Sequence, residues 1–192
     1  MKRLTILFGC LIFASIVFAQ EHLTFKNIPI DGDIKNFTKE MISAGFSKDT
    51  ENSSDTYTIF KGEFMGKSSE IYVFCTPTGL VFKVLVLHEY STWSSLSSAF
   101  NDATELFTKK YGKPSSDYHF FSSPYYNGDG YELQALRNDK CYYLYIWEPD
   151  NGTIAVQLKN IGKSYYVTIT YEDEINQKIR DNAKEKAALD DI

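Results

Sequence analysis

Apolar residues recur at every third or fourth position in two segments, a spacing that places them on one face of a helix. The first segment predicts a helix over 34–44, between Asp33 as N-cap and Gly45, which suits the left-handed conformation that ends helices. The second predicts a longer helix over 93–111, which begins after a serine and a threonine and ends before a Gly-Lys-Pro sequence.

Shorter segments alternate between apolar and polar residues or are apolar throughout, which predicts strands. We expect strands over 56–62, 70–76, 80–88, 131–137, 141–147, 153–159 and 164–171. The run 80–88 is apolar on both faces apart from Lys83, as in a central strand covered on each side. A Thr-Pro-Thr-Gly turn joins it to 70–76, so the two strands should form a hairpin.

Three other segments are less regular. Residues 22–30 alternate enough to form a short edge strand or an extended arm, whereas 115–130 is polar and aromatic with turn signals and predicts a loop. From 172 onward the chain is charged and carries a thin apolar stripe, which predicts a C-terminal helix that buries little surface.

Each predicted helix is followed by a strand, a turn with proline and glycine, and a second strand, once over 71–86 and again over 142–158. This layout predicts an α+β fold in which a helix plus an antiparallel β-meander is repeated twice, with the helices on one face of the sheet and a C-terminal helix after it. We expect one half over 20–90 and the other over 91–192. The pattern leaves open whether the halves share one continuous sheet.

Residues 1–19 have the features of a secretory signal peptide that is removed on export. Lys2 and Arg3 precede an apolar run, and Val17-Phe18-Ala19 fits the cleavage site. The run is too short to cross a bilayer comfortably, and no second long apolar run follows it. We therefore expect an exported protein without a transmembrane segment, located in the periplasm, at the cell surface or outside the cell.

The predicted exported chain is acidic. The leader holds two basic residues and no acidic ones, so 18 basic and 25 acidic residues remain, for a net charge of −7. Nucleic acid requires concentrated Lys and Arg, so we expect no nucleic-acid partner. A chain of this length buries enough surface to fold without a metal or a disulfide, and no motif indicates a cofactor.

A resemblance rests on three stretches of the chain. They are His-Leu-Thr-Phe-Lys-Asn-Ile-Pro-Ile-Asp-Gly at 22–32, the helix end at Gly45-Phe46, and Tyr-Gly-Lys-Pro at 111–114. In these the chain resembles small exported proteins of unassigned function from Bacteroides-like bacteria. In architecture alone, the repeated layout also resembles the fold of β-lactamase inhibitor protein and of related outer-membrane assembly lipoproteins. Because the shared motifs are turns and helix caps, the resemblance implies structure and not chemistry.

No catalytic motif is present in the sequence. It lacks His-Glu-x-x-His, Gly-x-Ser-x-Gly and a Gly-rich phosphate loop, and its histidines, His22, His88 and His119, are far apart. We therefore assign no catalytic and no metal-binding residue. The enzymatic alternative is a hydrolase with His88 or His119 as base, which a cleft holding either imidazole beside Glu89, Asp117 or a serine would favour.

Two cysteines, Cys75 and Cys141, remain after the leader is removed, and each lies in a predicted strand. An exported protein can keep a disulfide, so one interpretation is that the two pair. They are equally consistent with two buried thiols that act as small hydrophobic residues.

Aromatic residues on one predicted strand give the best functional prediction. Alternation along 141–147 places Tyr143, Tyr145 and Trp147 on one face, and a tyrosine, a leucine and an isoleucine on the other. The aliphatic positions of the next strand match the second set, so we expect that set to pack on the helices. Tyr143, Tyr145 and Trp147, with Tyr166, would then form an outward surface suited to recognition.

Three functions follow from these observations. The first is a non-enzymatic protein that binds a protein or glycan partner through the aromatic sheet face. The second is the periplasmic hydrolase with a histidine base. The third is a structural, self-assembling module in which the same aromatic residues lie in a core or a dimer interface. The sequence does not indicate the oligomeric state.

Overall fold

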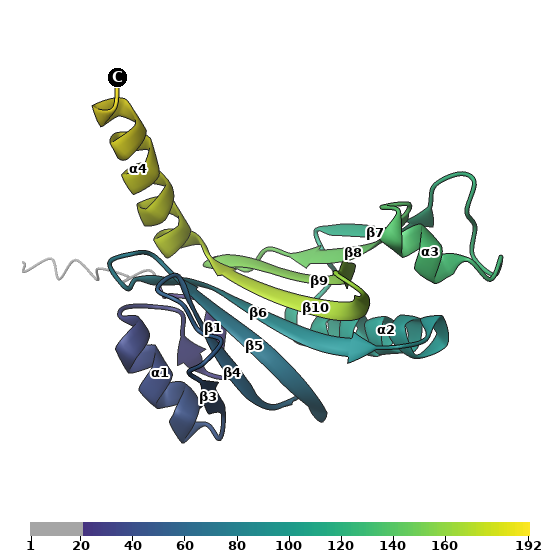
Figure 1. The fold of residues 1–192 in the computed structure, drawn as a ribbon, viewed down its shortest axis with the longest axis horizontal. Helices are drawn as coiled ribbons and strands as arrows, with labels where there is room; N and C mark the ends of the chain where they lie inside the picture. Colours follow the sequence, from purple (N-terminus) through teal and green to yellow (C-terminus); the bar gives the residue numbers. More distant parts are fainter. Residues whose placement is uncertain (1–20) are drawn as a thin grey trace, which may run out of the picture.

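The computed structural model describes residues 21–192, so the predicted signal peptide at 1–19 lies outside the described residues. The described chain contains one eight-stranded sheet with the strand order β3-β4-β5-β6-β10-β9-β8-β7 (Figure 1). All neighbouring strands in this sheet are antiparallel. The predicted α+β class, with helices beside a large antiparallel sheet and a C-terminal helix, is confirmed.

A helix and a meander build the first half. The helix α1 (Ile34–Ser43) begins at Asp33, whose carboxylate accepts a hydrogen bond from the Lys35 backbone nitrogen at 2.6 Å. Gly45 follows it with φ of +93°, a conformation that a side chain would disfavour. The strands are β3 (Ser47–Asp49), β4 (Tyr57–Phe64), β5 (Lys67–Cys75) and β6 (Val81–Tyr90).

The second half repeats this order with one added helix. The helix α2 (Trp93–Tyr111) begins at Thr92, whose hydroxyl accepts a hydrogen bond from the Ser95 backbone nitrogen. The strands are β7 (Ser116–Phe121), β8 (Cys141–Trp147), β9 (Gly152–Ile161) and β10 (Ser164–Asp173), and the short helix α3 (Glu132–Arg137) lies between β7 and β8.

Two predictions in this half are wrong. The segment 131–137 is not a strand, because its buried residues, Glu132, Ala135 and Leu136, recur at helical spacing and its sequence consists almost wholly of strong helix formers. The predicted loop contains β7, an edge strand whose two faces are both largely exposed. Such a strand lacks the apolar alternation by which strands are recognised.

The two halves join through their last strands. β6 and β10 pair antiparallel at the centre of the sheet, and Val86 lies opposite Ile169. Each is the sixth residue of its ten-residue strand, so an approximate two-fold relation passes between them. The halves therefore share one continuous sheet. The hairpin equivalent to β5-β6 is β9-β10, so the repeat recognised in the sequence is shifted by one hairpin.

The core lies on one face of the sheet, beneath α1, α2, α3 and an N-terminal arm. The sequence predicted one short edge strand or an extended arm here; instead the arm turns at Lys26 and Asn27 and forms a small hairpin of its own, β1 (Thr24–Phe25) with β2 (Ile28–Pro29). Phe25 is fully buried; its ring stacks on Phe64 of the first half at 5.2 Å and meets the edge of Tyr171 of the second half at 5.4 Å. The arm thus closes the core where the halves meet.

A buried carboxylate ties this arm to the last helix, α4 (Glu174–Asp190). Asp173 is fully buried and accepts hydrogen bonds from the backbone nitrogens of Leu23 at 2.8 Å and Asn176 at 2.9 Å. It also pairs with His22 Nδ1 at 3.1 Å. The Asn176 amide then donates to the Ile30 carbonyl oxygen at 2.9 Å. We call this group, Asp173 with His22, Leu23 and Asn176, the clasp.

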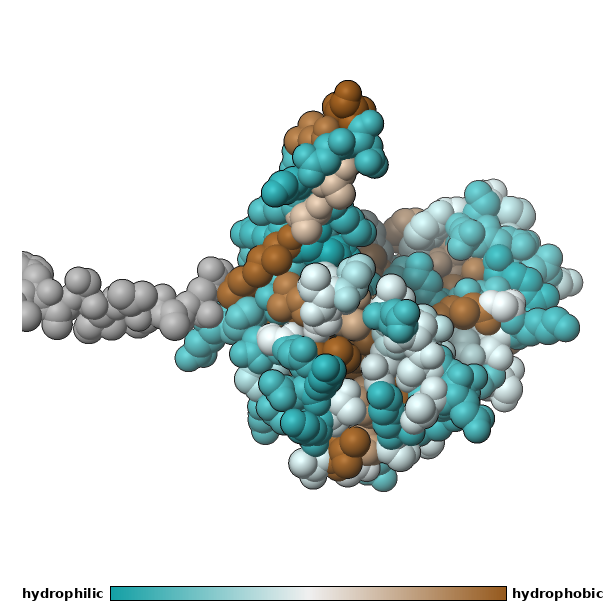
Figure 2. All heavy atoms as spheres, turned by 60° about the vertical axis from the view of Figure 1, so that its left-hand side comes forward, coloured by the Kyte–Doolittle hydropathy of each residue, from teal (hydrophilic) through white to brown (hydrophobic). Residues whose placement is uncertain are grey.

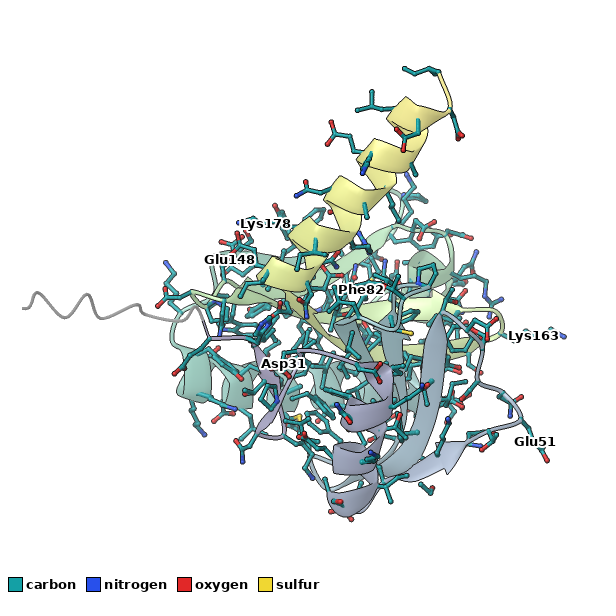
Figure 3. The ribbon with its side chains drawn as sticks, turned by 90° about the vertical axis from the view of Figure 1, so that its left-hand side faces the viewer. Asp31, Glu51, Phe82, Glu148, Lys163 and Lys178 are labelled. Carbon is teal, nitrogen blue, oxygen red and sulfur yellow. The ribbon has the colours of Figure 1, made fainter. Side chains whose placement is uncertain are left out.

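The rest of α4 leaves the body of the protein. It rises on the side of the sheet opposite α1, and Phe82 lies beneath its base (Figures 1 and 3). Residues 181–192 are exposed throughout, and apolar side chains, Ile179 and Leu189 among them, lie open to solvent along the helix (Figure 2). Across residues 21–192, no helix combines the length and apolar character needed to cross a membrane.

Candidate functional site

The aromatic residues of β8 face the core, and the predicted orientation of this strand is wrong. Tyr143 and Trp147 are only 4% and 2% exposed. The Tyr143 ring packs edge-on against Phe100 of α2 at 5.4 Å, and Trp147 Nε1 donates a hydrogen bond to the Gly112 carbonyl oxygen at 3.0 Å. Tyr145 lies on the same side, 5.6 Å from the Phe100 ring. These three residues therefore hold α2 on the sheet.

The register of β8 against β9 explains the error. Tyr145 lies opposite Val156, and Trp147 lies opposite Ile154. Paired residues share a face, so the aromatic positions of β8 and the aliphatic positions of β9 both point at α2. The prediction had paired the aliphatic residues of β8 with those of β9. A shift of one residue in register moves every side chain of a strand to the opposite face, so this pairing placed the aromatic residues outward.

The opposite face of the sheet is the candidate site. We call it the open face, because within residues 21–192 the helices α1, α2 and α3 all pack on the other side and, of the helices, α4 alone contacts it. Its aromatic and large aliphatic side chains come from six strands and include Tyr57, Tyr72, Phe74, Leu85, Tyr118, Phe120, Tyr142, Leu144, Ile146 and Tyr166. Of the four predicted binding residues, Tyr166 alone lies here.

One group of rings occupies the part of the open face built by the first half. Tyr57 lies 5.7 Å from Tyr72 and 6.0 Å from Phe74, measured between ring centroids. Phe74 is followed at 6.5 Å by Phe82, over which the Arg180 guanidinium of α4 sits at 4.5 Å. We call Tyr57, Tyr72, Phe74 and Phe82 the first ring group. It ends against α4, so the helix forms one wall of the open face.

Charged groups hold this first ring group in place. The Tyr72 hydroxyl donates to the Glu70 carboxylate at 3.2 Å, and burial together with that carboxylate raises the pKa of Tyr72 to about 12. The phenol therefore stays neutral and able to donate. Lys83 pairs with Glu172 at 2.8 Å and lies 5.9 Å from the Phe74 ring.

A second ring group lies at the other edge of the sheet, on β7 and β8. Phe120 stacks on Tyr142 at 4.8 Å, and Tyr118 lies 6.5 Å from Phe120. The three side chains are 47%, 41% and 47% exposed for Phe120, Tyr142 and Tyr118. Exposed aromatic clusters of this kind are uncommon on surfaces without a partner, because they keep apolar area in water.

Short side chains separate the two ring groups. A row across the sheet runs from Leu87 of β6 through Thr168 and Gln157 to Leu144 of β8, and the next row has Thr170 and Ala155 at its centre. The centre of the open face therefore carries short and polar side chains on β9 and β10, and the aromatic rings lie toward its two edges. The one sequence signal for the second ring group is Tyr118 and Phe120 on either side of His119, an alternation too short to identify a strand.

The predicted hydrolase base His88 is in the core beside a serine. Its Nε2 lies 2.7 Å from Ser69 Oγ, and both residues are 5% exposed. The Ser69 hydroxyl donates its single proton to the Lys67 carbonyl oxygen at 2.9 Å, so His88 Nε2 must carry the proton shared with Ser69. A protonated Nε2 cannot take a proton from Ser69. Burial also lowers the pKa of His88, which favours the neutral ring.

The other two histidines also lie against structural partners. His119 is exposed on β7, and its ring lies 3.9 Å from that of Tyr143. Burial by this packing lowers the pKa of His119. His22 belongs to the clasp. Within residues 21–192, no cluster of three or more His, Cys, Asp or Glu side chains is placed to hold a metal ion.

The cysteines do not form the disulfide that was one of the two alternatives. Cys75 and Cys141 are both free and buried. They lie on β5 and β8, which have three strands between them, so about 19 Å separates the strands. A disulfide needs Cα atoms within ~7 Å. Burial raises the pKa of both thiols, to about 12 for Cys141, so neither is a poised nucleophile.

Comparison with known proteins adds no assignment. No family model, no curated protein and no solved structure matches the chain. The resemblances stated from the sequence motifs therefore stay predictions, and the function has to be argued from the open face itself.

Proposed function

We propose that this chain is an exported, non-enzymatic binding protein that holds a folded protein partner against its open face. The observation that supports the proposal is the pair of ring groups on an uncovered sheet face, with three side chains of the second group more than 40% exposed. Tyrosine and phenylalanine bury large areas at small entropic cost, and tyrosine adds a polar hydroxyl.

The dimensions of the face favour a protein over a glycan as partner. From β4 to β7 the sheet spans six strand spacings, about 29 Å, and its central strands are ten residues long. That area is of the order of the ~800 Å² that each protein buries in a standard interface. A glycan would need only one ring group, whereas two ring groups at opposite edges of the sheet suit the larger surface of a folded protein.

The hydrolase alternative has less support. In the Ser69–His88 pair the serine donates its proton to the Lys67 carbonyl oxygen and not to the histidine, as a nucleophile would, and both residues are only 5% exposed. A catalytic pair must reach substrate, so burial alone removes this pair from consideration. Self-assembly through the open face is the remaining alternative, and the experiment below separates it.

The test is capture, identification and quantitative binding. The purified protein is immobilised, envelope proteins of the source cell are passed over it, and the retained protein is purified and titrated by calorimetry. We expect the double variant Phe120→Ala/Tyr142→Ala to weaken binding at least tenfold while the melting temperature stays within about 2 °C of the parent. Tyr126→Ala is the matched control, because Tyr126 is 66% exposed but lies outside the sheet.

Two results would contradict the proposal. One is equal affinity of the double variant and the Tyr126→Ala control, which would place the interface elsewhere. The other is sedimentation of the purified protein as a dimer that Phe120→Ala/Tyr142→Ala converts to a monomer, which would assign the open face to self-assembly. Binding of a glycan from an array to the open face would mean that the partner is a glycan and not a protein.

A further inference from the structure

A pocket of about 210 Å³ lies on the helix side of the sheet, away from the open face. It sits where the N-terminal arm, the β4-β5 turn and the end of α2 meet, so both halves of the chain line it. Its apolar lining comes from Phe64 and Met65 at the β4-β5 turn, from Leu106 and Phe107 of α2, and from Tyr171 of β10. We call it the seam pocket.

The walls are apolar and the space is larger than packing requires. Protein cores contain few voids larger than a water molecule, and an apolar cavity of ~150 Å³ already holds benzene. Leu106 is 51% exposed at the rim, although it stands on the helix face next to buried Phe107. An apolar tail of about six to eight carbons would fill this space and cover Leu106.

Two lysines stand at this pocket without acidic partners. Lys26 and Lys110 both line it, and none of the ion pairs within residues 21–192 involves either. Their ammonium groups lie instead over aromatic rings, Lys26 at 5.2 Å from Phe46 and Lys110 at 4.9 Å from Tyr111. The neighbouring Lys109, by contrast, pairs with Glu105 at 2.6 Å. The chain has an excess of acidic residues, yet these two lysines at one apolar pocket have no acidic partner. They therefore favour the binding of an anionic ligand.

Tyr171 supplies a third polar group. The residue is 5% exposed and lines the seam pocket, and no group of residues 21–192 forms a hydrogen bond with its hydroxyl. Burial raises the pKa of Tyr171, so the phenol is a neutral donor. A buried hydroxyl without a partner costs free energy until a ligand or water satisfies it.

We propose that the seam pocket binds a small amphipathic carboxylate, with the apolar tail between Met65 and Leu106 and the carboxylate paired with Lys26 and Lys110. A carboxylate accepts from two ammonium groups and from a phenol, so it satisfies all three polar groups of the pocket. This site is separate from the open face and goes beyond the proposed partner-binding function, so the failure of either leaves the other intact.

The test uses octanoate as the probe, followed by two-dimensional NMR of the ¹⁵N-labelled protein. We expect saturable shifts of the backbone amides of Met65, Leu106 and Tyr111. Octanol has the same tail without the charge, and butyrate has the charge on a short tail, so each should bind at least tenfold more weakly. Raising the salt concentration should weaken the binding of octanoate but not that of octanol, because salt screens the attraction between the lysines and the carboxylate.

Two substitutions connect the binding to the lysines. Lys26→Gln/Lys110→Gln should weaken octanoate at least fivefold without changing the melting temperature, because both side chains are exposed. Lys109→Gln is the matched control and should bind octanoate as the parent does. Absence of saturable shifts, equal binding of octanol and octanoate, or equal binding by the double variant and the control would each overturn the proposal.

Discussion

At the scale of single residues, several polar groups in the core are held by complete hydrogen bonds. Ser69 and His88 are an example: the serine donates to the Lys67 carbonyl oxygen, and the histidine donates to the serine. Sequence could not show this pair, because 19 residues separate its members and the contact exists only when β5 and β6 are in register. A pattern along the chain reports which face a residue occupies, not which atom it meets.

His88 gives a prediction about pH. Burial lowers its pKa in the folded protein below the ~6.5 of the unfolded chain, so protonation favours unfolding. The stabilisation is complete above pH 6.5 and is lost as the pH falls below that value. The urea midpoint should therefore decline between pH 7.5 and 5.5, and His88→Gln, which keeps a donor for Ser69, should decline less.

His119 provides the comparison for this measurement. Its pKa is also lowered, but the residue is exposed and is only partly desolvated by the rings of Phe100 and Tyr143. His119→Gln should therefore remove less of the parent's decline in urea midpoint than His88→Gln does. An unchanged decline in His88→Gln would contradict the role of His88 in this pH range.

At the scale of elements, local patterns predicted most helices and strands well. The strand at Cys141–Trp147 and the start of the helix at Ile34 match the prediction, because both have strong boundaries in sequence. The errors have physical causes. Helix formers at 131–137 also alternate in polarity, and the edge strand β7 buries too little to show a pattern. The binding face of β8 was misassigned because register is set by the partner strand.

The clasp makes the last helix and the first strands depend on each other. Asp173 caps α4 and holds the arm. Asp173→Ala therefore leaves two buried backbone donors unpaired, Leu23 N in the arm and Asn176 N in the first turn of α4. We expect it to lower the free energy of unfolding by about 2–4 kcal/mol. Hydrogen exchange should accelerate at residues 23–30 as well as in the first turn of α4.

A matched control is Asp190→Ala at the exposed end of the same helix. It should change stability by less than ~0.5 kcal/mol, as exposed positions do. Faster exchange confined to α4 in Asp173→Ala would show that the arm is held by its apolar residues alone.

At the scale of the whole molecule, the two halves should unfold together. Their joint is the pairing of β6 with β10, where Ile169 is fully buried opposite Val86. Ile169→Ala should lower stability by about 2–5 kcal/mol. The loss of stability should be the same by two measurements. The fluorescence of Trp93 and Trp147 reports on the second half, and hydrogen exchange of β4 and β5 reports on the first.

Ile42→Ala is the control, because Ile42 is 53% exposed on α1 and its loss should change both readouts little. If Ile169→Ala shifted the tryptophan signal and left β4 and β5 protected, the halves would be separate folding units that merely share a sheet.

The central pairing has one more consequence. Two ten-residue strands that meet at their sixth residues, each ending a helix-and-meander unit, have the geometry of a symmetric homodimer, but here one chain supplies both units through the link between Tyr90 and Trp93. A homodimer must present the same surface twice. A single chain is free of this constraint: the first unit carries the rings of Tyr57, Tyr72 and Phe74 on β4 and β5, and the second carries those of Tyr118, Phe120 and Tyr142 on β7 and β8. One continuous sheet can therefore present two different groups of rings, which two identical subunits could not.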